Sequence, residues 1–183
     1  MCKNQQQVLG LFLLSCLMLQ QTTADSVDCS KFPNPIRPQQ CCNFPELFKQ
    51  NALDYCKDVQ QKSEQCFYEC VFKATEIFRK AEFSYPKVED YIDWVMKPED
   101  EFSLIYKNAY HKCIDKVNQI EINLSTHQFS DKNGCSPLPE MVYLCVKNEM
   151  FAHCPRDHWN FDAEDCVTKR NFINNCIREE QLN

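Results

Sequence analysis

The cysteines and histidines of this chain are the residues that could do chemistry. One residue separates His111 from Cys113, and His153 is adjacent to Cys154; a histidine close to a thiolate can hold a metal ion or activate the sulfur. The chain has 14 cysteines, however, and secreted chains of this cysteine density use their sulfur for disulfides. We therefore interpret these cysteines as disulfide partners, and we expect neither a metal site nor a cofactor.

Motifs of several enzyme classes are missing from the sequence. It contains no HExxH zinc motif and no serine flanked by the glycines of a nucleophile elbow. Its 2 glycines, Gly10 and Gly134, are too few for a loop that cradles phosphate groups. The Cys41-Cys42 doublet is similar to the one before the catalytic histidine of secreted phospholipases A2, but the His-Asp pair and the glycine-rich calcium loop of those enzymes are missing. The sequence predicts a protein that is not an enzyme.

Residues 1–24 have the pattern of a secretory signal peptide. Lys3 precedes an apolar run of 12 residues, Val8 to Leu19, and a Thr-Thr-Ala triplet that suits signal peptidase ends at Ala24. A membrane-spanning helix needs roughly 20 apolar residues, and no later stretch approaches that length. We therefore expect residues 25–183 to form a secreted, extracellular protein of one domain, without membrane insertion.

Removal of the signal peptide leaves an even number of cysteines. Cys2 and Cys16 leave with it, so twelve of the 14 remain, which predicts six disulfides in an oxidising compartment. These twelve are Cys29, Cys41, Cys42, Cys56, Cys66, Cys70, Cys113, Cys135, Cys145, Cys154, Cys166 and Cys176. The loss of Lys3 also makes the formal net charge more negative than −6. Because an acidic chain without a basic patch repels nucleic acid, we expect no nucleic-acid partner.

The segments that carry most of these cysteines have apolar residues at the spacing of an α-helix. Apolar residues recur every three or four positions, and Pro86 and Pro98 stand near the starts of two such segments, where a helix tolerates proline. The expected helices are 45–59, 66–78, 86–95, 98–120, 140–152 and 162–178. Strand patterns are nearly absent, and the scarcity of glycine leaves few tight hairpin turns. The sequence predicts an all-α fold, a compact bundle of about six to eight helices around an apolar cavity, cross-linked by six disulfides.

Three segments lie outside this helical pattern. Residues 25–44 are rich in proline and should form an extended arm. Residues 121–139 lose the periodicity and should form a long surface loop, and residues 155–183 should form a C-terminal extension. Asn123 begins an Asn-Leu-Ser sequon within that loop, which makes it a candidate for glycosylation.

The spacing of the later cysteines is more specific than the composition. The pattern reads Cys66-x3-Cys70-x42-Cys113-x21-Cys135-x9-Cys145-x8-Cys154-Pro155-x10-Cys166. It resembles that of the insect odorant-binding proteins, and specifically their Plus-C subgroup, in which a proline directly follows the sixth conserved cysteine. The resemblance covers Cys66 to Cys166.

This resemblance implies part of the disulfide pattern. The three implied pairs are Cys66 with Cys145, Cys113 with Cys154, and Cys70 with either Cys41 or Cys42. Cys66 and Cys70 are four residues apart, so on a helix they share one face and can tie it to two different segments. The other cysteines would form three further bridges, whose pairing stays open.

The resemblance also implies a function and partners. Insect odorant-binding proteins reversibly bind small hydrophobic ligands, such as odorants, pheromone-like volatiles or lipids, in an internal cavity and transport them through aqueous fluid. A small apolar ligand is therefore the expected partner, a membrane chemoreceptor is a further candidate, and monomer and homodimer both stay open. Six apolar or amphipathic residues on helices expected to meet are the hypothetical lining of the cavity. They are Phe67, Val71, Phe78, Trp94, Tyr106 and Tyr110.

A second interpretation of the sequence stays open. Secreted helical proteins with many disulfides also recognise other proteins or microbial surfaces outside olfaction, and one fold can serve both purposes. An enclosed apolar cavity would favour the carrier, whereas an exposed aromatic patch without a cavity would favour recognition of a protein.

Overall fold

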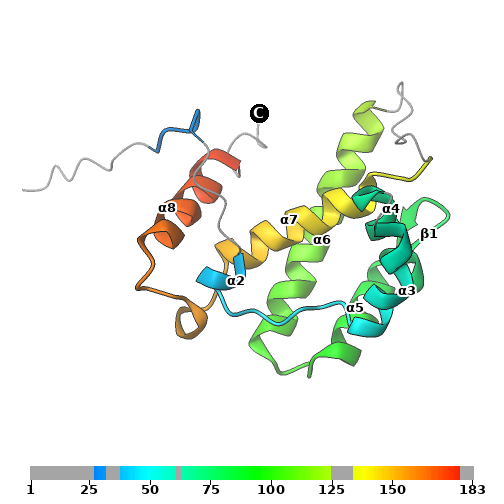
Figure 1. Ribbon diagram of the computed structural model, residues 1–183, viewed down its shortest axis with the longest axis horizontal. Helices are drawn as coiled ribbons and strands as arrows, with labels where there is room; N and C mark the ends of the chain where they lie inside the picture. The colour runs from blue at the N-terminus through cyan, green and yellow to red at the C-terminus, as the bar shows by residue number, and fades with distance from the viewer. Residues whose placement is uncertain (1–26, 32–37, 61–62, 125–133, 178–183) are drawn as a thin grey trace, which may run out of the picture.

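Two long helices, α6 and α7, organise the protein. The structure, a computed structural model, describes residues 27–31, 38–60, 63–124 and 134–177, so the signal peptide expected at residues 1–24 lies outside it. The elements are α2 (Pro38–Cys41), α3 (Gln50–Gln60), α4 (Glu64–Ala74), β1 (Phe78–Arg79), β2 (Glu82–Phe83), α5 (Tyr85–Val95), α6 (Glu101–Leu124), α7 (Leu138–Ala152), a 3-10 turn (Arg156–His158), and α8 (Glu164–Phe172) with a π-helical end (Ile173–Ile177). In Figure 1, α3, α4 and α5 lie on one side of the molecule, and α2 and α8 on the other. The prediction of an all-α fold with six disulfides is confirmed.

The helix α4 ends earlier than its apolar spacing predicts. The hydroxyl of Thr75 donates a hydrogen bond to the carbonyl oxygen of Val71 at 3.0 Å, a side-chain contact that competes with continued helix. The next residue, Glu76, has a φ of 62° and leaves the helical region. The helix expected over residues 66–78 therefore ends at Ala74.

A small hairpin follows α4 and begins at Phe78, the last residue of the expected helix, whereas the sequence predicted few tight hairpin turns. The strands β1 and β2 pair antiparallel, with Phe78 opposite Phe83. Lys80 and Ala81 form the turn and have φ values of 51° and 65°. Two-residue hairpin turns with positive φ usually have glycine or asparagine at these positions. The Phe78 and Phe83 rings pack with centroids 4.8 Å apart, and this contact helps to offset the cost of the turn.

The helix α6 extends about one turn past its predicted end, because no glycine or proline follows Ile120 until the sequence reaches Gly134. The first residues of the loop expected at 121–139 are therefore helical. Asn123 lies in this last turn, and its side chain is outside the described part of the structure, as are residues 125–133. The following helix α7 begins at Leu138, so the expected loop is shorter at both ends.

The N-terminal arm is joined to the C-terminal extension. Within the arm, α2 is a short helix where the prolines predicted extended chain. Cys42 forms an antiparallel bridge with Trp159, and the backbone N–H of Asn160 donates to the carbonyl oxygen of Cys41 at 2.8 Å. This pairing holds the cysteine doublet beside the segment that follows α7.

All twelve predicted cysteines form disulfides, but each pair implied by the resemblance is wrong. The bridges are Cys29–Cys176, Cys41–Cys166, Cys42–Cys154, Cys56–Cys70, Cys66–Cys135 and Cys113–Cys145. The implied pairs were Cys66–Cys145, Cys113–Cys154, and Cys70 with Cys41 or Cys42. Three of the observed bridges join the arm to Cys154, just after α7, and to the extension beyond it.

The positions of the helices explain these partners. The strand-like pairing with Trp159 brings Cys42 to Cys154, so neither residue is available to its implied partner. The helix α3 packs along α4, which places Cys56 beside Cys70. As expected, the cysteines on α4 tie this helix to two segments, but the segments are α3 and the stretch that leads into α7.

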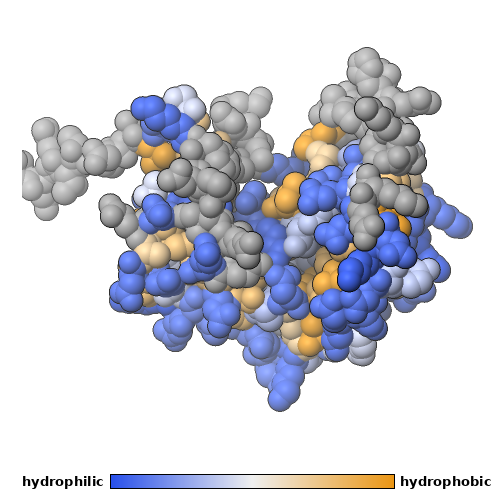
Figure 2. All heavy atoms as spheres, viewed as in Figure 1, coloured by the Kyte–Doolittle hydropathy of each residue, from blue (hydrophilic) through white to orange (hydrophobic). Residues whose placement is uncertain are grey.

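The core lies where α4, α5, α6 and α7 meet. Its largest fully buried side chains include Tyr110, Phe72, Phe78, Ile92 and Met150. Figure 2 shows a mostly polar face that is hollowed between the side that holds α8 and the side that holds α4, with apolar side chains exposed at the hollow. The packed core therefore leaves part of its apolar surface accessible at the edges of the helices.

Candidate functional site

A pocket between α3, α4 and α7 brings together aromatic side chains that could bind an apolar molecule. It has a volume of about 370 Å³, and we call it the aromatic groove. Its apolar lining is Phe48, Leu53, Phe67, Tyr68, Val71 and Tyr143. Its polar lining, all of it exposed, is Glu46, Gln50, Asp54, Lys57 and Gln60. An apolar wall with a few polar groups is typical of sites for small ligands.

Helical spacing places the lining residues of α4 and α7. Phe67 and Val71 are four residues apart, so they share one face of α4, and both are buried. Tyr143 comes from α7, which packs against α4. Phe48 lies just before α3 and approaches the same place from a third direction. The groove therefore depends on the packing of three separate segments.

The aromatic rings form a continuous wall. The rings of Tyr68 and Tyr143 stack with centroids 4.3 Å apart and planes inclined by 28°. Phe67 packs edge-on against Tyr68 at 5.4 Å, and Phe48 stacks with Tyr143 at 6.3 Å. Such ring pairs contribute about 0.5–1.5 kcal/mol each beyond their buried area, and together they form an apolar side of the groove.

The tyrosine hydroxyls of this wall remain neutral. Burial raises the pKa of Tyr143 above its ordinary value of 10.0, and nearby Tyr68 and Glu46 add to the effect. Burial likewise raises the pKa of Tyr68, although its hydrogen bond with Tyr143 acts in the opposite direction. A neutral phenol group can both donate and accept a hydrogen bond, so the groove has polar groups that could orient a ligand.

The structure brings only part of the predicted lining to this groove. Phe67 and Val71 line it. Phe78, Tyr106 and Tyr110 are packed in the core, each at most 2% exposed, and none of these three is among the residues that line the groove. Burial raises the pKa of the Tyr110 hydroxyl well above its ordinary value, as expected for a side chain surrounded by protein.

The prediction that Trp94 lines a cavity is wrong. Its side chain is 60% exposed on α5, and the ammonium group of Lys49 lies 3.8 Å from its ring centroid. The buried face of α5 is formed instead by Val88 and Ile92. Trp94 lies off that face, where it contacts solvent, Lys49 and the ring of Tyr91, with the two ring centroids 5.6 Å apart.

Four lining residues, Phe48, Leu53, Tyr68 and Tyr143, were missing from the predicted set. Phe48 belongs to an apolar stripe that the sequence does show, and Tyr68 follows Phe67 directly. The signal that could have found Phe48 and Tyr68 was therefore the aromatic content of α4 and of the segment just before α3. Their approach to α7 depends on tertiary packing, which the spacing of residues in one helix does not encode.

The described residues hold neither a metal cluster nor a membrane span. Among them, no group of three or more His, Cys, Asp and Glu side chains is arranged to hold a metal ion. Across the same ranges, no helix combines the length and the apolar character that crossing a membrane requires.

Comparison with known proteins identifies the family. Residues 39–172 match the family described as AgamOBP47-like, a range that contains every described disulfide except Cys29–Cys176. The chain is also 23% identical to general odorant-binding protein 68 of Anopheles gambiae over 185 residues, which covers 94% of this chain and 87% of that protein. The family match includes Cys41 and Cys42, the helices from α3 to α7 and all of α8, and so includes the whole aromatic groove. The chain therefore belongs to the AgamOBP47-like family of insect odorant-binding proteins.

Proposed function

We propose that this protein is a secreted carrier that reversibly binds small hydrophobic molecules in the aromatic groove and transports them through an aqueous extracellular fluid. The observation that carries this proposal is the wall of stacked rings formed by Phe48, Phe67, Tyr68 and Tyr143. The similarity to a general odorant-binding protein supports the same class of ligand.

The size of the groove suits a molecule larger than a single ring. Its volume of about 370 Å³ exceeds the roughly 150 Å³ of an engineered cavity that binds benzene. Apolar burial contributes about 25 cal/mol per Å², so covering roughly 300 Å² of surface contributes about 7.5 kcal/mol before the costs of binding. A micromolar Kd corresponds to about −8 kcal/mol. Affinity of this order would allow a carrier both to load and to release its ligand.

The polar groups of the groove favour a ligand with one neutral polar group. The hydroxyls of Tyr68 and Tyr143 are neutral and lie at the aromatic wall. Glu46 and Asp54 line the groove together with Lys57. Glu46 is paired with Lys147 at 3.0 Å, so the charged groups among the described residues of the groove are largely balanced and leave no cation dedicated to an anionic ligand. Odorant-like or pheromone-like alcohols, aldehydes and esters therefore fit better than ionised fatty acids.

The disulfide framework supports secretion, because six such bridges persist only in an oxidising environment. The position of Pro155 directly after Cys154 supports membership of the Plus-C subgroup. A carrier of odorant-like molecules must pass its ligand to a protein that detects it, and a membrane chemoreceptor is the proposed partner for this transfer.

The proposal is tested by titrating the polarity-sensitive probe N-phenyl-1-naphthylamine into oxidised protein that comprises residues 25–183. A panel of apolar alcohols, aldehydes, esters and fatty acids then competes for the bound probe. We expect saturable binding with a Kd of about 1 µM, or about −8 kcal/mol, and stronger competition by the neutral compounds. Absence of saturable binding, with all disulfides verified, would contradict the carrier and favour recognition of a protein or microbial surface.

A further inference from the structure

A second pocket lies between α6 and α7 and shares no lining residue with the aromatic groove. Its volume is about 220 Å³. The helix α6 supplies Ile105, Asn108, Ala109 and Lys112, whose spacing of three and four residues places them on one helix face. Glu149 of α7 and His153, the residue directly after α7, also line the pocket and are one turn apart. We call this the α6–α7 pocket.

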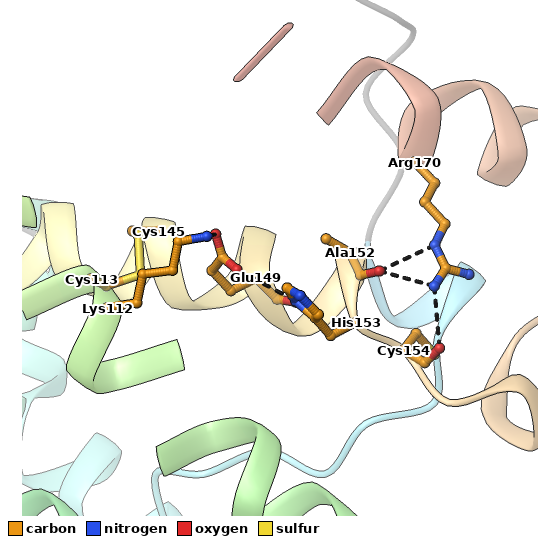
Figure 3. Close-up of polar contacts among 8 residues, drawn as sticks. All are labelled: Lys112, Cys113, Cys145, Glu149, Ala152, His153, Cys154 and Arg170. Carbon is orange, nitrogen blue, oxygen red and sulfur yellow. Dashed lines mark hydrogen bonds and ion pairs between the residues drawn. A yellow bond between two sulfur atoms is a disulfide. The ribbon is translucent and has the colours of Figure 1, made fainter. Parts of the chain in front are cut away.

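The shape of the pocket is fixed by covalent and apolar contacts. A disulfide joins Cys113 to Cys145 beside Lys112 and so ties α6 to α7 (Figure 3). Ala109 is buried and Ile105 is half-buried, and these two residues give the pocket an apolar side. Because both helices are held in place, the pocket does not need to form when a ligand arrives.

Glu149 is the polar centre of the pocket. Its side chain is only 8% exposed, although a buried carboxylate is costly unless its oxygens are hydrogen-bonded. The Oε1 atom accepts a hydrogen bond from the Lys112 ammonium group at 2.5 Å. The Oε2 atom lies 3.4 Å from Nδ1 of His153, but that nitrogen is closer to the Glu149 backbone carbonyl oxygen, at 2.9 Å. Figure 3 shows Glu149 between these two partners.

The second carboxylate oxygen therefore has unused capacity to accept a hydrogen bond. A carboxylate has about four lone-pair positions, and the described contacts occupy few of them. The charge of Glu149 is already balanced by Lys112, so a neutral ligand fits the pocket better than an ion. A ligand carboxylate would be repelled by Glu149, and a ligand ammonium group would compete with Lys112.

We propose that the α6–α7 pocket is a second binding site, specific for a small phenol whose hydroxyl donates a hydrogen bond to Oε2 of Glu149. The aromatic ring of the ligand packs against Ile105 and Ala109. A cavity of roughly 150 Å³ holds benzene, so about 220 Å³ holds one substituted ring. This site goes beyond the proposed carrier function, because it selects a hydroxyl group by a charged acceptor and lies apart from the aromatic groove.

The test compares 4-methylphenol with 4-methylanisole, which has the same ring but no hydroxyl hydrogen. Their Kd values are measured by calorimetry on the oxidised protein, and the site is located from NMR shifts of the Ala109 methyl group and of Tyr68. Hydrogen bonds to charged groups are worth enough for about tenfold discrimination or more. We expect 4-methylphenol to bind at least about tenfold more tightly than 4-methylanisole and to shift Ala109 rather than Tyr68.

Two substitutions separate hydroxyl recognition from apolar packing. Glu149→Leu removes the acceptor, keeps a similar volume and leaves Lys112 partly solvated, so it should remove the preference for 4-methylphenol. Ile105→Ala should weaken both compounds by a similar factor. Glu140→Gln, a substitution at the other end of the same helix and outside the pocket, is the control and should change neither Kd. Circular dichroism verifies the fold of each variant.

The outcomes distinguish this site from the aromatic groove. Equal affinity of the two compounds for the wild-type protein, or no binding of 4-methylphenol, would overturn the second site and leave the carrier proposal intact. Shifts confined to Tyr68 would also overturn it and would assign the phenol to the aromatic groove. Binding at Ala109 that persists when the fluorescent probe saturates the groove would support two separate sites.

Discussion

Arg170 of α8 donates two hydrogen bonds to the carbonyl oxygen of Ala152, the last residue of α7, at 3.2 Å from Nε and 2.9 Å from Nη2 (Figure 3). A third hydrogen bond, at 3.4 Å, reaches the carbonyl oxygen of Cys154. Carbonyl groups at the end of a helix lack partners within it, and a cation there is favourable. The guanidinium also lies 4.6 Å from the Trp159 ring centroid. Arg170 thus fastens the C-terminal extension to the helix that carries Tyr143.

Replacement of Arg170 should therefore weaken the extension. Hydrogen bonds to a charged group contribute about 1.5–3 kcal/mol, so we expect Arg170→Ala to lower the free energy of unfolding by about this amount, measured by denaturant titration with disulfides intact. Arg170→Lys should recover part of it, because a lysine lacks the planar fork. The matched control is Arg79→Ala, since Arg79 is exposed on the hairpin. A loss no larger than that of the control would contradict this role.

The disulfide pairing can be read directly by mass spectrometry. We expect proteolysis of the unreduced protein to release peptides that join Cys66 to Cys135 and Cys113 to Cys145, as the packing of α4, α6 and α7 requires. Recovery of a peptide that joins Cys66 to Cys145 would contradict the arrangement of these helices. Reduced and alkylated protein serves as the control for peptide assignment.

The hairpin turn should be stabilised by glycine. Ala81 is exposed and has a φ of 65°, a region that disfavours residues with a Cβ and that glycine enters freely. We expect Ala81→Gly to raise the free energy of unfolding by about 0.5–1 kcal/mol. Ala74→Gly, an exposed site at the end of α4, should have the opposite sign because glycine disfavours a helix. If Ala81→Gly lowered the free energy of unfolding as Ala74→Gly does, the positive φ of Ala81 would not be a source of strain.

The contact between Tyr85 and Asp115 should make the free energy of unfolding depend on pH in the alkaline range. The Tyr85 hydroxyl donates to Oδ1 of Asp115 at 2.5 Å, and burial, this hydrogen bond and the Asp115 charge raise the pKa of Tyr85 from 10.0 to about 12. The unfolded chain loses this proton near pH 10, whereas the folded protein keeps it until about pH 12. The resulting stabilisation is complete below pH 10 and is lost as the pH rises through this window.

Absorbance titration of tyrosinate measures this effect. We expect Asp115→Asn to move the titration of Tyr85 to lower pH, because it removes the charge that opposes the phenolate. Tyr85→Phe identifies the part of the absorbance change that belongs to this residue. A titration that is the same in the wild-type protein and in Asp115→Asn would contradict the contact.

The helices could be predicted from the sequence because their signals are local. Apolar residues at helical spacing, together with Ser84 and Pro86 at the start of α5, indicate helices without reference to the rest of the chain. The hairpin was missed because Lys80 and Ala81 adopt positive φ values without glycine. The disulfide partners were wrong because they depend on which segments pack together, and that information is not contained in the cysteine intervals.

The candidate site could be predicted only in part, for a similar reason. Phe67 and Val71 follow from the apolar face of α4. Tyr143 joins them from a helix more than 70 residues later in the chain, and its approach depends on how α4 and α7 pack. Trp94 was misplaced because an aromatic residue on an amphipathic helix can still lie beside the buried face rather than on it.

The most direct test of the carrier proposal is the Kd of N-phenyl-1-naphthylamine for three proteins, the wild type, Tyr68→Ala and Tyr55→Ala. Tyr68 lines the aromatic groove, whereas Tyr55 is a tyrosine of α3 that is 78% exposed and lies outside it. We predict that Tyr68→Ala raises the Kd about tenfold, which corresponds to about 1.4 kcal/mol, and that Tyr55→Ala leaves it unchanged. Equal Kd values for all three folded proteins, or a larger effect of Tyr55→Ala, would contradict binding in the aromatic groove.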